Sequence, residues 1–294
     1  MTLILFVLFN TLSVLNQEVK KFDSDLAQDY LKIHDHQVFY ETSGSGIPVV
    51  LIHGGYLDQT IWDSQVDFLN RRGFMTIRFD DIGHGKTISG ESSVYGYEII
   101  DGLLNELNLS KVNIVGLSWG TMMAVDFTLK FPEKVDKLSL ISPGLNGWDY
   151  FQDEKAKSNF ELRQRARANS DKEQFVEYFQ KNWIDGPGCD SLRVHLGIRS
   201  RIRAIMMVNI EMHWGEDWSE LLNPPAIERL AEINSQTLIL TGNLDGQDIQ
   251  LIAGKLDVEI VGYERIEIDN VAHTLNLENP NKTNHLIYKF LKNP

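Results

Sequence analysis

One serine in this sequence lies in a setting that could make it a nucleophile. Ser118 stands between two glycines in the run Gly116-Leu117-Ser118-Trp119-Gly120, which fits the pattern G-x-S-x-G. In that pattern a buried strand turns sharply into a helix and lifts the serine hydroxyl above the sheet. Side chains two residues to either side would collide at the turn, so glycine fills both places.

Two further residues could activate that hydroxyl. A serine attacks well only when a base takes its proton, and the base is commonly a histidine oriented by a carboxylate. Asp245 follows the apolar run 237–240, and His273 follows the strand-like run 260–268. Asp248 lies on the same loop as Asp245 and is the alternative carboxylate. The order serine, acid, histidine, with each partner after a later strand, predicts nucleophilic catalysis.

The elements that must position these residues alternate between strands and helices. The run 49–52 is wholly apolar and ends at His53-Gly54-Gly55, as expected of a parallel strand buried on both faces. Further strands are expected at 31–33 and 37–40, which form a hairpin, and at 74–79, 112–115, 138–141, 237–240 and 260–268. Helices are expected at 94–107, 121–131 and 249–256, and a last one begins at Asn279-Pro280. The alternation predicts an α/β fold with a mostly parallel sheet flanked by helices, and a site at the carboxyl ends of its strands.

A block at about 145–230 interrupts this alternation. It is helical in pattern, charged and aromatic, and contains no good strand. We expect it to be a helical cap above Ser118, inserted into a domain of residues 26–294. Its apolar ceiling favours a small to medium uncharged ester or lactone with an apolar part. The side chains that would form it are Trp148, Tyr150, Phe151, Phe175, Tyr178, Phe179, Trp183, Met206, Met207, Met212, Trp214 and Trp218.

From about residue 30 to its end, the chain resembles α/β-hydrolase-fold proteins of the single-domain esterase, lactonase and perhydrolase type. Besides the serine pentapeptide, the matching motifs are His53-Gly54-Gly55-Tyr56, Gly242-Asn243-Leu244-Asp245, and His273 followed by Glu278-Asn279-Pro280. Four motifs in the correct order are far more specific than any one of them. The resemblance implies that Ser118 is the nucleophile, His273 the general base and acid, and Asp245 the orienting carboxylate.

The resemblance also implies an oxyanion hole. One donor is the backbone N–H of Trp119, which follows the nucleophile. The second comes from Gly55 or Tyr56, between which the sequence does not choose. Two positions depart from the family pattern: Ile82 replaces an arginine, and Asn270 replaces a glycine before the histidine. Asparagine tolerates positive φ, so the second change is mild.

The remaining ionisable residues have mostly structural interpretations. His53 is expected to brace the oxyanion loop, whereas His84, His213 and His285 are expected to be surface or packing residues. Four arginines form a basic cluster in an acidic chain, which predicts a salt-bridged helix face, with recognition of a substrate carboxylate as the alternative. These are Arg193, Arg199, Arg201 and Arg203.

Composition excludes several classes of partner. The 294 residues include 28 Lys and Arg and 41 Asp and Glu, for a formal net charge of −13. Phosphate binding needs clustered positive charge, so we expect no nucleic-acid partner. The lone cysteine, Cys189, excludes an intramolecular disulfide. No Cys and His residues stand at metal-ligand spacing, so neither a metal nor another cofactor is expected.

The first 25 residues begin with an uncharged apolar stretch, MTLILFVLFNTLSVL. It is too short for a stable membrane span. It resembles the core of a signal peptide, which predicts a secreted or periplasmic protein, although it lacks a basic n-region. The alternative is an N-terminal helix that packs on the domain or on a partner in a cytoplasmic protein.

The sequence therefore predicts a serine hydrolase that cleaves a carboxylic ester or lactone through a Ser-His-Asp triad and an acyl-enzyme. Hydrolysis of carbon–carbon bonds and perhydrolysis use the same triad and stay open as alternatives. A ligand sensor of this fold with slow turnover is the alternative from another class. The sequence carries no indication of the oligomeric state.

Overall fold

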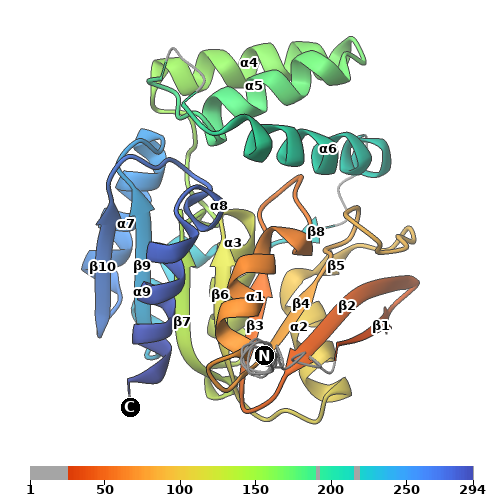
Figure 1. Cartoon of the computed structure of the whole chain (residues 1–294), viewed down its shortest axis with the longest axis vertical. Coiled ribbons are helices and arrows are strands. Elements are labelled where there is room, and N and C mark those ends of the chain that lie inside the picture. The colour runs from red at the N-terminus through yellow and green to blue at the C-terminus, as the bar shows by residue number, and fades with distance from the viewer. Residues whose placement is uncertain (1–25, 190–192, 215–218, 294) are drawn as a thin grey trace, which may run out of the picture.

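The computed structural model describes residues 26–189, 193–214 and 219–293 (Figure 1). The apolar segment 1–25, predicted to be a signal-peptide core, lies outside the described residues, as does Trp218 of the predicted cap. Among the described residues, no helix is both long enough and apolar enough to cross a membrane.

An eight-stranded sheet forms the centre of the described chain, in the order β1-β2-β4-β3-β6-β7-β9-β10. β2 pairs antiparallel with β1 and β4, and the other neighbours pair in parallel, so the prediction of a mostly parallel sheet is confirmed. The strands are β1 (Ala27–Ile33), β2 (His36–Gly44), β3 (Ile47–Ile52), β4 (Phe74–Phe79), β6 (Val112–Leu117), β7 (Val135–Ile141), β9 (Gln236–Gly242) and β10 (Tyr263–Ile268).

Alternate side chains of the central strands enter two different cores. In β3, Val50 and Ile52 pack into one apolar cluster, whereas Val49 and Leu51 pack into the other, and all four are fully buried. This explains why the strand reads as one continuous apolar run, because helices cover both faces of the sheet. The buried side chains of α1, α8 and α9 belong to one cluster, and those of α2, α3 and α7 to the other.

Four of these covering helices, α2, α3, α7 and α9, lie close to the predicted positions, whereas α1 and α8 were not predicted. The covering helices are α1 (Asp63–Asn70), α2 (Gly96–Glu106), α3 (Trp119–Lys130), α7 (Gln247–Glu259), α8 (Leu275–Glu278) and α9 (Pro280–Lys292). The Asn279 side chain caps α9 by accepting from the N–H of Lys282, as the Asn-Pro signal predicts. Short 3-10 turns occur at η1 (Gln59–Trp62), η2 (Pro132–Lys134), η3 (Ala226–Glu228) and η4 (Leu230–Glu232).

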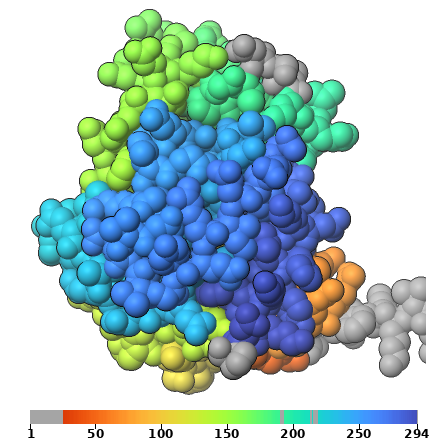
Figure 2. All heavy atoms as spheres, turned by 90° about the vertical axis from the view of Figure 1, so that its left-hand side faces the viewer, coloured from red at the N-terminus to blue at the C-terminus, as the bar shows by residue number. Residues whose placement is uncertain are grey.

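Three helices lie above the carboxyl edge of the sheet and are called the cap here (Figure 1). They are α4 (Glu154–Ala168), α5 (Lys172–Trp183) and α6 (Leu196–His213). Asp153 and Asp171 cap the first two through side-chain bonds to backbone N–H groups. Seen from the side, the cap stands on top of the blue C-terminal part of the chain (Figure 2).

Two short strands differ from the predicted pattern. The helix expected from residue 94 begins only at Gly96, because Val94–Tyr95 forms β5. This strand pairs in parallel with β8 (Ser219–Glu220), which lies inside the block predicted to contain no strand. The pair ties the chain returning from the cap to the start of α2.

Candidate active site

The turn after β6 holds Ser118 in a strained backbone conformation. Ser118 has φ of 55° and ψ of −114° and directly precedes α3. A Cβ at Gly116 would lie 2.5 Å from the carbonyl oxygen of Gly120, and one at Gly120 would lie 2.4 Å from that of Ile52. Both distances are far below van der Waals contact, so the two glycines are what allows the turn to form.

Loops after β9 and β10 bring the candidate acid and base together. The Nδ1 atom of His273 lies 2.9 Å and 3.1 Å from the two carboxylate oxygens of Asp245. The Asp245 side chain is fully buried and that of His273 is 5% exposed. A carboxylate beside Nδ1 favours the tautomer with its proton there, which leaves Nε2 free to accept a proton. Asn270, with φ of 62°, makes the turn before the histidine as expected.

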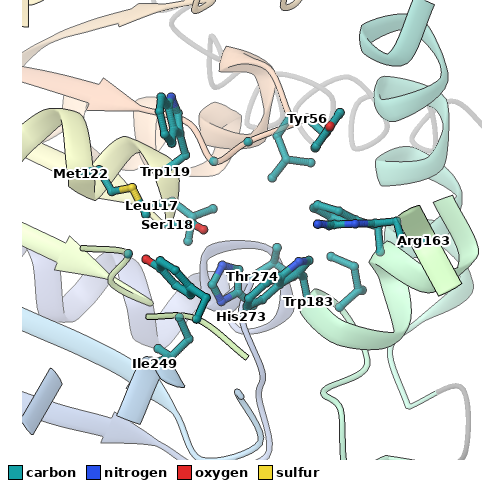
Figure 3. A pocket seen from close by; sticks show the side chains of 17 residues that line it. Tyr56, Leu117, Ser118, Trp119, Met122, Arg163, Trp183, Ile249, His273 and Thr274 are labelled. Atoms are coloured by element: carbon teal, nitrogen blue, oxygen red, sulfur yellow. The ribbon is translucent and has the colours of Figure 1, made fainter. Parts of the chain in front are cut away.

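Ser118 and His273 line the same cavity, of about 260 Å³, between the sheet edge and the cap (Figure 3). The sheet side contributes the serine turn, the loop after β3 and the histidine loop. The cap side contributes Arg163 from α4 and Phe179 and Trp183 from α5. The apolar side chains of the lining are Leu57, Leu117, Met122, Phe179, Ile184 and Ile249.

Two backbone N–H groups beside Ser118 are the candidates for an oxyanion hole. Trp119 is the first residue of α3, where an N–H has no partner within the helix. Gly55 lies on the facing loop and lines the same cavity. The N–H of Tyr56, the alternative donor, instead donates to Nε2 of His84 at 3.0 Å. That bond leaves Gly55 better suited than Tyr56 to supply the second donor.

His84 and His53 both hold the loop after β3. His53 accepts from the N–H of Asp81 through Nε2 and contacts the Gly54 carbonyl through Nδ1. His84, predicted to be a surface or packing residue, is 3% exposed and accepts from Tyr56. In both rings Nε2 is the accepting nitrogen. The bracing role predicted for His53 is confirmed, and His84 shares it.

Asn209 links the cap to the same loop, and sequence reasoning missed it. Its amide nitrogen, on α6, donates to the carbonyls of Tyr56 and Leu57, and its oxygen accepts from the N–H of Gly85. The side chain is fully buried. The loop therefore has fixed partners both beneath it, from the histidines, and above it, from the cap.

The aromatic ceiling contacts the histidine directly. The Trp183 ring lies 4.6 Å from the His273 ring, centre to centre, with the planes tilted by 46°. Trp119 is fixed from the other side, since its indole N–H donates to Asp81 at 2.9 Å. Aromatic contacts at this distance stabilise a single ring orientation.

The alternative acid and the arginine cluster have other roles. Asp248 accepts from the indole N–H of Trp148 and the backbone N–H of Phe151, so it anchors the start of the cap chain. The predicted salt-bridged face is confirmed, because each arginine of the cluster has an acidic partner. The pairs are Arg193 with Glu278, Arg199 with Asp185, Arg201 with Asp63, and Arg203 with Glu173.

Two of the remaining predicted positions, His285 and Ile82, are not part of the cavity lining. His285 is exposed, as expected, and the His213 side chain lies outside the part of the chain that the structure describes. Ile82, at the family's arginine position, is buried. Within the described ranges, no group of three or more His, Cys, Asp and Glu side chains could hold a metal ion.

The chain matches a family model described as alpha/beta hydrolase fold over residues 47–280. The matched family is the one that the sequence motifs indicate. Among curated proteins, a 2-hydroxy-6-oxononadienedioate/2-hydroxy-6-oxononatrienedioate hydrolase of Escherichia coli (strain K12) is 28% identical over 289 residues. That match covers 90% of this chain and 92% of the relative.

Solved structures share the fold at lower sequence identity. A thermophilic esterase from Thermogutta terrifontis has a TM-score of 0.69 and 21% identity, and the match covers 91% of this chain and 98% of that chain. An enol-lactonase from Burkholderia xenovorans LB400 has a TM-score of 0.70 and 17% identity, with coverage of 90% and 100%. At such identities the likeness shows the fold alone.

Proposed function

Because the chain belongs to the alpha/beta hydrolase fold family and is a hydrolase, we propose that it cleaves a carboxylic ester or lactone through a covalent acyl-enzyme. The observation that carries this proposal is the contact between His273 Nδ1 and the Asp245 carboxylate, beside a cavity that the same histidine shares with Ser118. Nucleophile, base and orienting acid are the parts that acyl transfer requires.

In the proposed mechanism, Ser118 Oγ attacks the substrate carbonyl while His273 Nε2 takes its proton. Asp245 keeps the imidazole in the correct tautomer and stabilises the imidazolium that forms. The N–H groups of Trp119 and Gly55 stabilise the oxyanion of the tetrahedral intermediate. The imidazolium then protonates the leaving alcohol, and a water molecule activated by the same histidine releases the acid. The apolar lining supports a substrate of modest size with an apolar part.

Replacement of the nucleophile tests the chemistry. Ser118→Ala should lower turnover of p-nitrophenyl butyrate by at least about ten-thousand-fold, because no other hydroxyl takes over the attack. Mass spectrometry of the quenched wild-type enzyme should show an added butyryl group on the peptide that contains Ser118. The variant should keep the wild-type circular dichroism spectrum. Wild-type activity in the variant would refute the assignment.

Two other functions use the same residues. The Escherichia coli relative supports carbon–carbon hydrolysis, so the substrate panel should include 2-hydroxy-6-oxononadienedioate. Perhydrolysis is the other alternative with the same triad, and peracetic acid formation from acetate and hydrogen peroxide tests it. A ligand sensor would form the acyl-enzyme but release it slowly. Multiple turnovers on any member of the panel support the enzyme, whereas a single burst on every member supports the sensor.

A further inference from the structure

One cationic side chain of the cavity has no anionic partner. Arg163 extends from α4 into the cavity, on the wall opposite Ser118 (Figure 3). Within the described ranges, no carboxylate pairs with its guanidinium, and its Nε atom is buried without a hydrogen-bond partner. The four clustered arginines all have acidic partners, so Arg163 differs from them.

Three aromatic rings hold this guanidinium in place. Its central carbon lies 5.1, 5.5 and 5.7 Å from the ring centres of Phe160, Phe175 and Phe179. A buried cation loses its hydration energy, and cation–π contacts of this length compensate for only part of that loss. Burial lowers the pKa of Arg163 to about 10, helped by the like charge of Arg167, so the side chain stays charged at neutral pH.

We propose that Arg163 binds a carboxylate on the substrate, so that the preferred substrate is an ester or lactone that also carries a free acid group. This rests on the proposed function, because it places the acid group in the same cavity as the attacked carbonyl. No Asp or Glu occurs among the described residues that line the cavity, so no carboxylate there competes for the guanidinium. The ionisable neighbour in the lining is Tyr56, which acts to raise the pKa of Arg163 against the effect of burial. The planar guanidinium matches a carboxylate through two parallel hydrogen bonds.

The expected substrate changes accordingly. The sequence favours an uncharged molecule and, as the alternative, carboxylate recognition by the arginine cluster. The cluster residues instead pair with protein carboxylates, and the unpaired arginine lies on a different cap helix, among the apolar residues of the ceiling. The substrate would therefore combine an apolar middle with one charged end.

A pair of matched substrates tests this specificity. p-Nitrophenyl hydrogen adipate carries a free carboxylate, and methyl p-nitrophenyl adipate is its neutral counterpart. For the wild type, kcat/KM should be about 10- to 100-fold higher for the acid, as expected for a charge-assisted hydrogen-bonded pair. In Arg163→Met this ratio should fall to about one or below, mainly through KM, and Arg163→Lys should give an intermediate ratio.

The control is Arg165→Met, on the exposed face of the same helix, which should keep the wild-type ratio. A wild-type ratio near one, or an unchanged ratio in Arg163→Met, would overturn the inference even if Ser118-dependent hydrolysis is intact. If ester hydrolysis proves independent of Ser118, the proposed function fails instead. Calorimetric titration with adipate then tests carboxylate binding by Arg163 without any ester hydrolysis. The wild type should bind adipate at least about tenfold more tightly than Arg163→Met. Equal affinity would refute the role of Arg163.

Discussion

The Trp183 ring lies against the His273 ring, 4.6 Å from centre to centre, so a cap helix contacts the candidate base directly. Such a contact fixes the imidazole and keeps water from its face. An aromatic pair contributes about 0.5–1.5 kcal/mol beyond its buried area. Trp183→Ala should therefore lower kcat for p-nitrophenyl butyrate by about three- to tenfold.

Trp183→Phe should retain most of this activity because it keeps a ring over the histidine. Tyr178→Ala, on the same helix but away from the cavity lining, is the matched control and should leave kcat within about twofold. Equal losses in the alanine and phenylalanine variants would show that the ring contact is unimportant.

The two aspartates of the acid loop should behave differently. Asp245→Asn keeps the shape of the side chain but favours the wrong imidazole tautomer, so kcat should fall by about ten-thousand-fold with little change in melting temperature. Asp248→Asn should keep kcat within about tenfold, because Asp248 bonds the cap chain and not the histidine. The kinetic constants of the two purified variants decide which carboxylate belongs to the site, and a larger loss in Asp248→Asn would reverse the assignment.

His84 should matter for the transition state although it does not reach the substrate. In His84→Ala the Tyr56 N–H loses its acceptor, and the loop that carries Gly55 loses one of its supports. We expect kcat to fall by about tenfold with a small change in KM. His84→Gln, whose side-chain oxygen can accept the same bond, should recover part of the loss. His285→Ala, an exposed histidine on α9, should show wild-type kinetics; a normal kcat in His84→Ala would exclude the positioning role.

Asp126 should make stability depend on pH in an unusual direction. Burial raises the pKa of this α3 carboxyl and outweighs the bond from the Leu222 N–H and the opposing effects of Asn146 and Arg229. The folded protein then binds a proton more tightly than the unfolded chain. The ionised carboxylate therefore costs stability above its folded pKa, and this cost disappears as the pH falls through that value.

Asp126→Asn removes the cost at neutral pH. Its free energy of unfolding in urea should exceed that of the wild type by about 1 kcal/mol at pH 7.5, and the difference should vanish near pH 4. Asp149→Asn, the same change at an exposed site, should match the wild type at both values. A difference that grows on acidification would contradict the sign of the shift.

Most of the sheet could be predicted because its strands are buried on both faces. The run 49–52 is apolar at every position, as is typical of a short parallel strand between two layers of helices. The last strand begins at Tyr263, three residues later than predicted, because Gly262 adopts φ of 82° and turns the chain just before it. The sequence does not reveal this boundary, because Ile260 and Val261 are β-branched and apolar, as strand residues commonly are.

The catalytic candidates were easier to predict than the residues that surround and position them. Ser118, Asp245 and His273 follow strands whose carboxyl ends must meet, so topology alone predicts that they lie close together. His84 and Arg163 carry no comparable local signal. Whether a histidine accepts from an N–H 28 positions away, or an arginine lacks a partner, depends on how distant segments pack.

Asn209 makes the cap and the oxyanion loop thermodynamically interdependent. Its three hydrogen bonds join α6 to the carbonyls of Tyr56 and Leu57 and to the N–H of Gly85, so helix displacement and loop distortion share one free-energy cost. A ligand that stabilises the position of the cap also stabilises the loop that carries the proposed donor Gly55, and the reverse holds to the same extent. Under the proposed function, substrate binding to the cap and stabilisation of the transition state would therefore depend on the same conformational equilibrium, that between the ordered and the distorted arrangement of cap and loop.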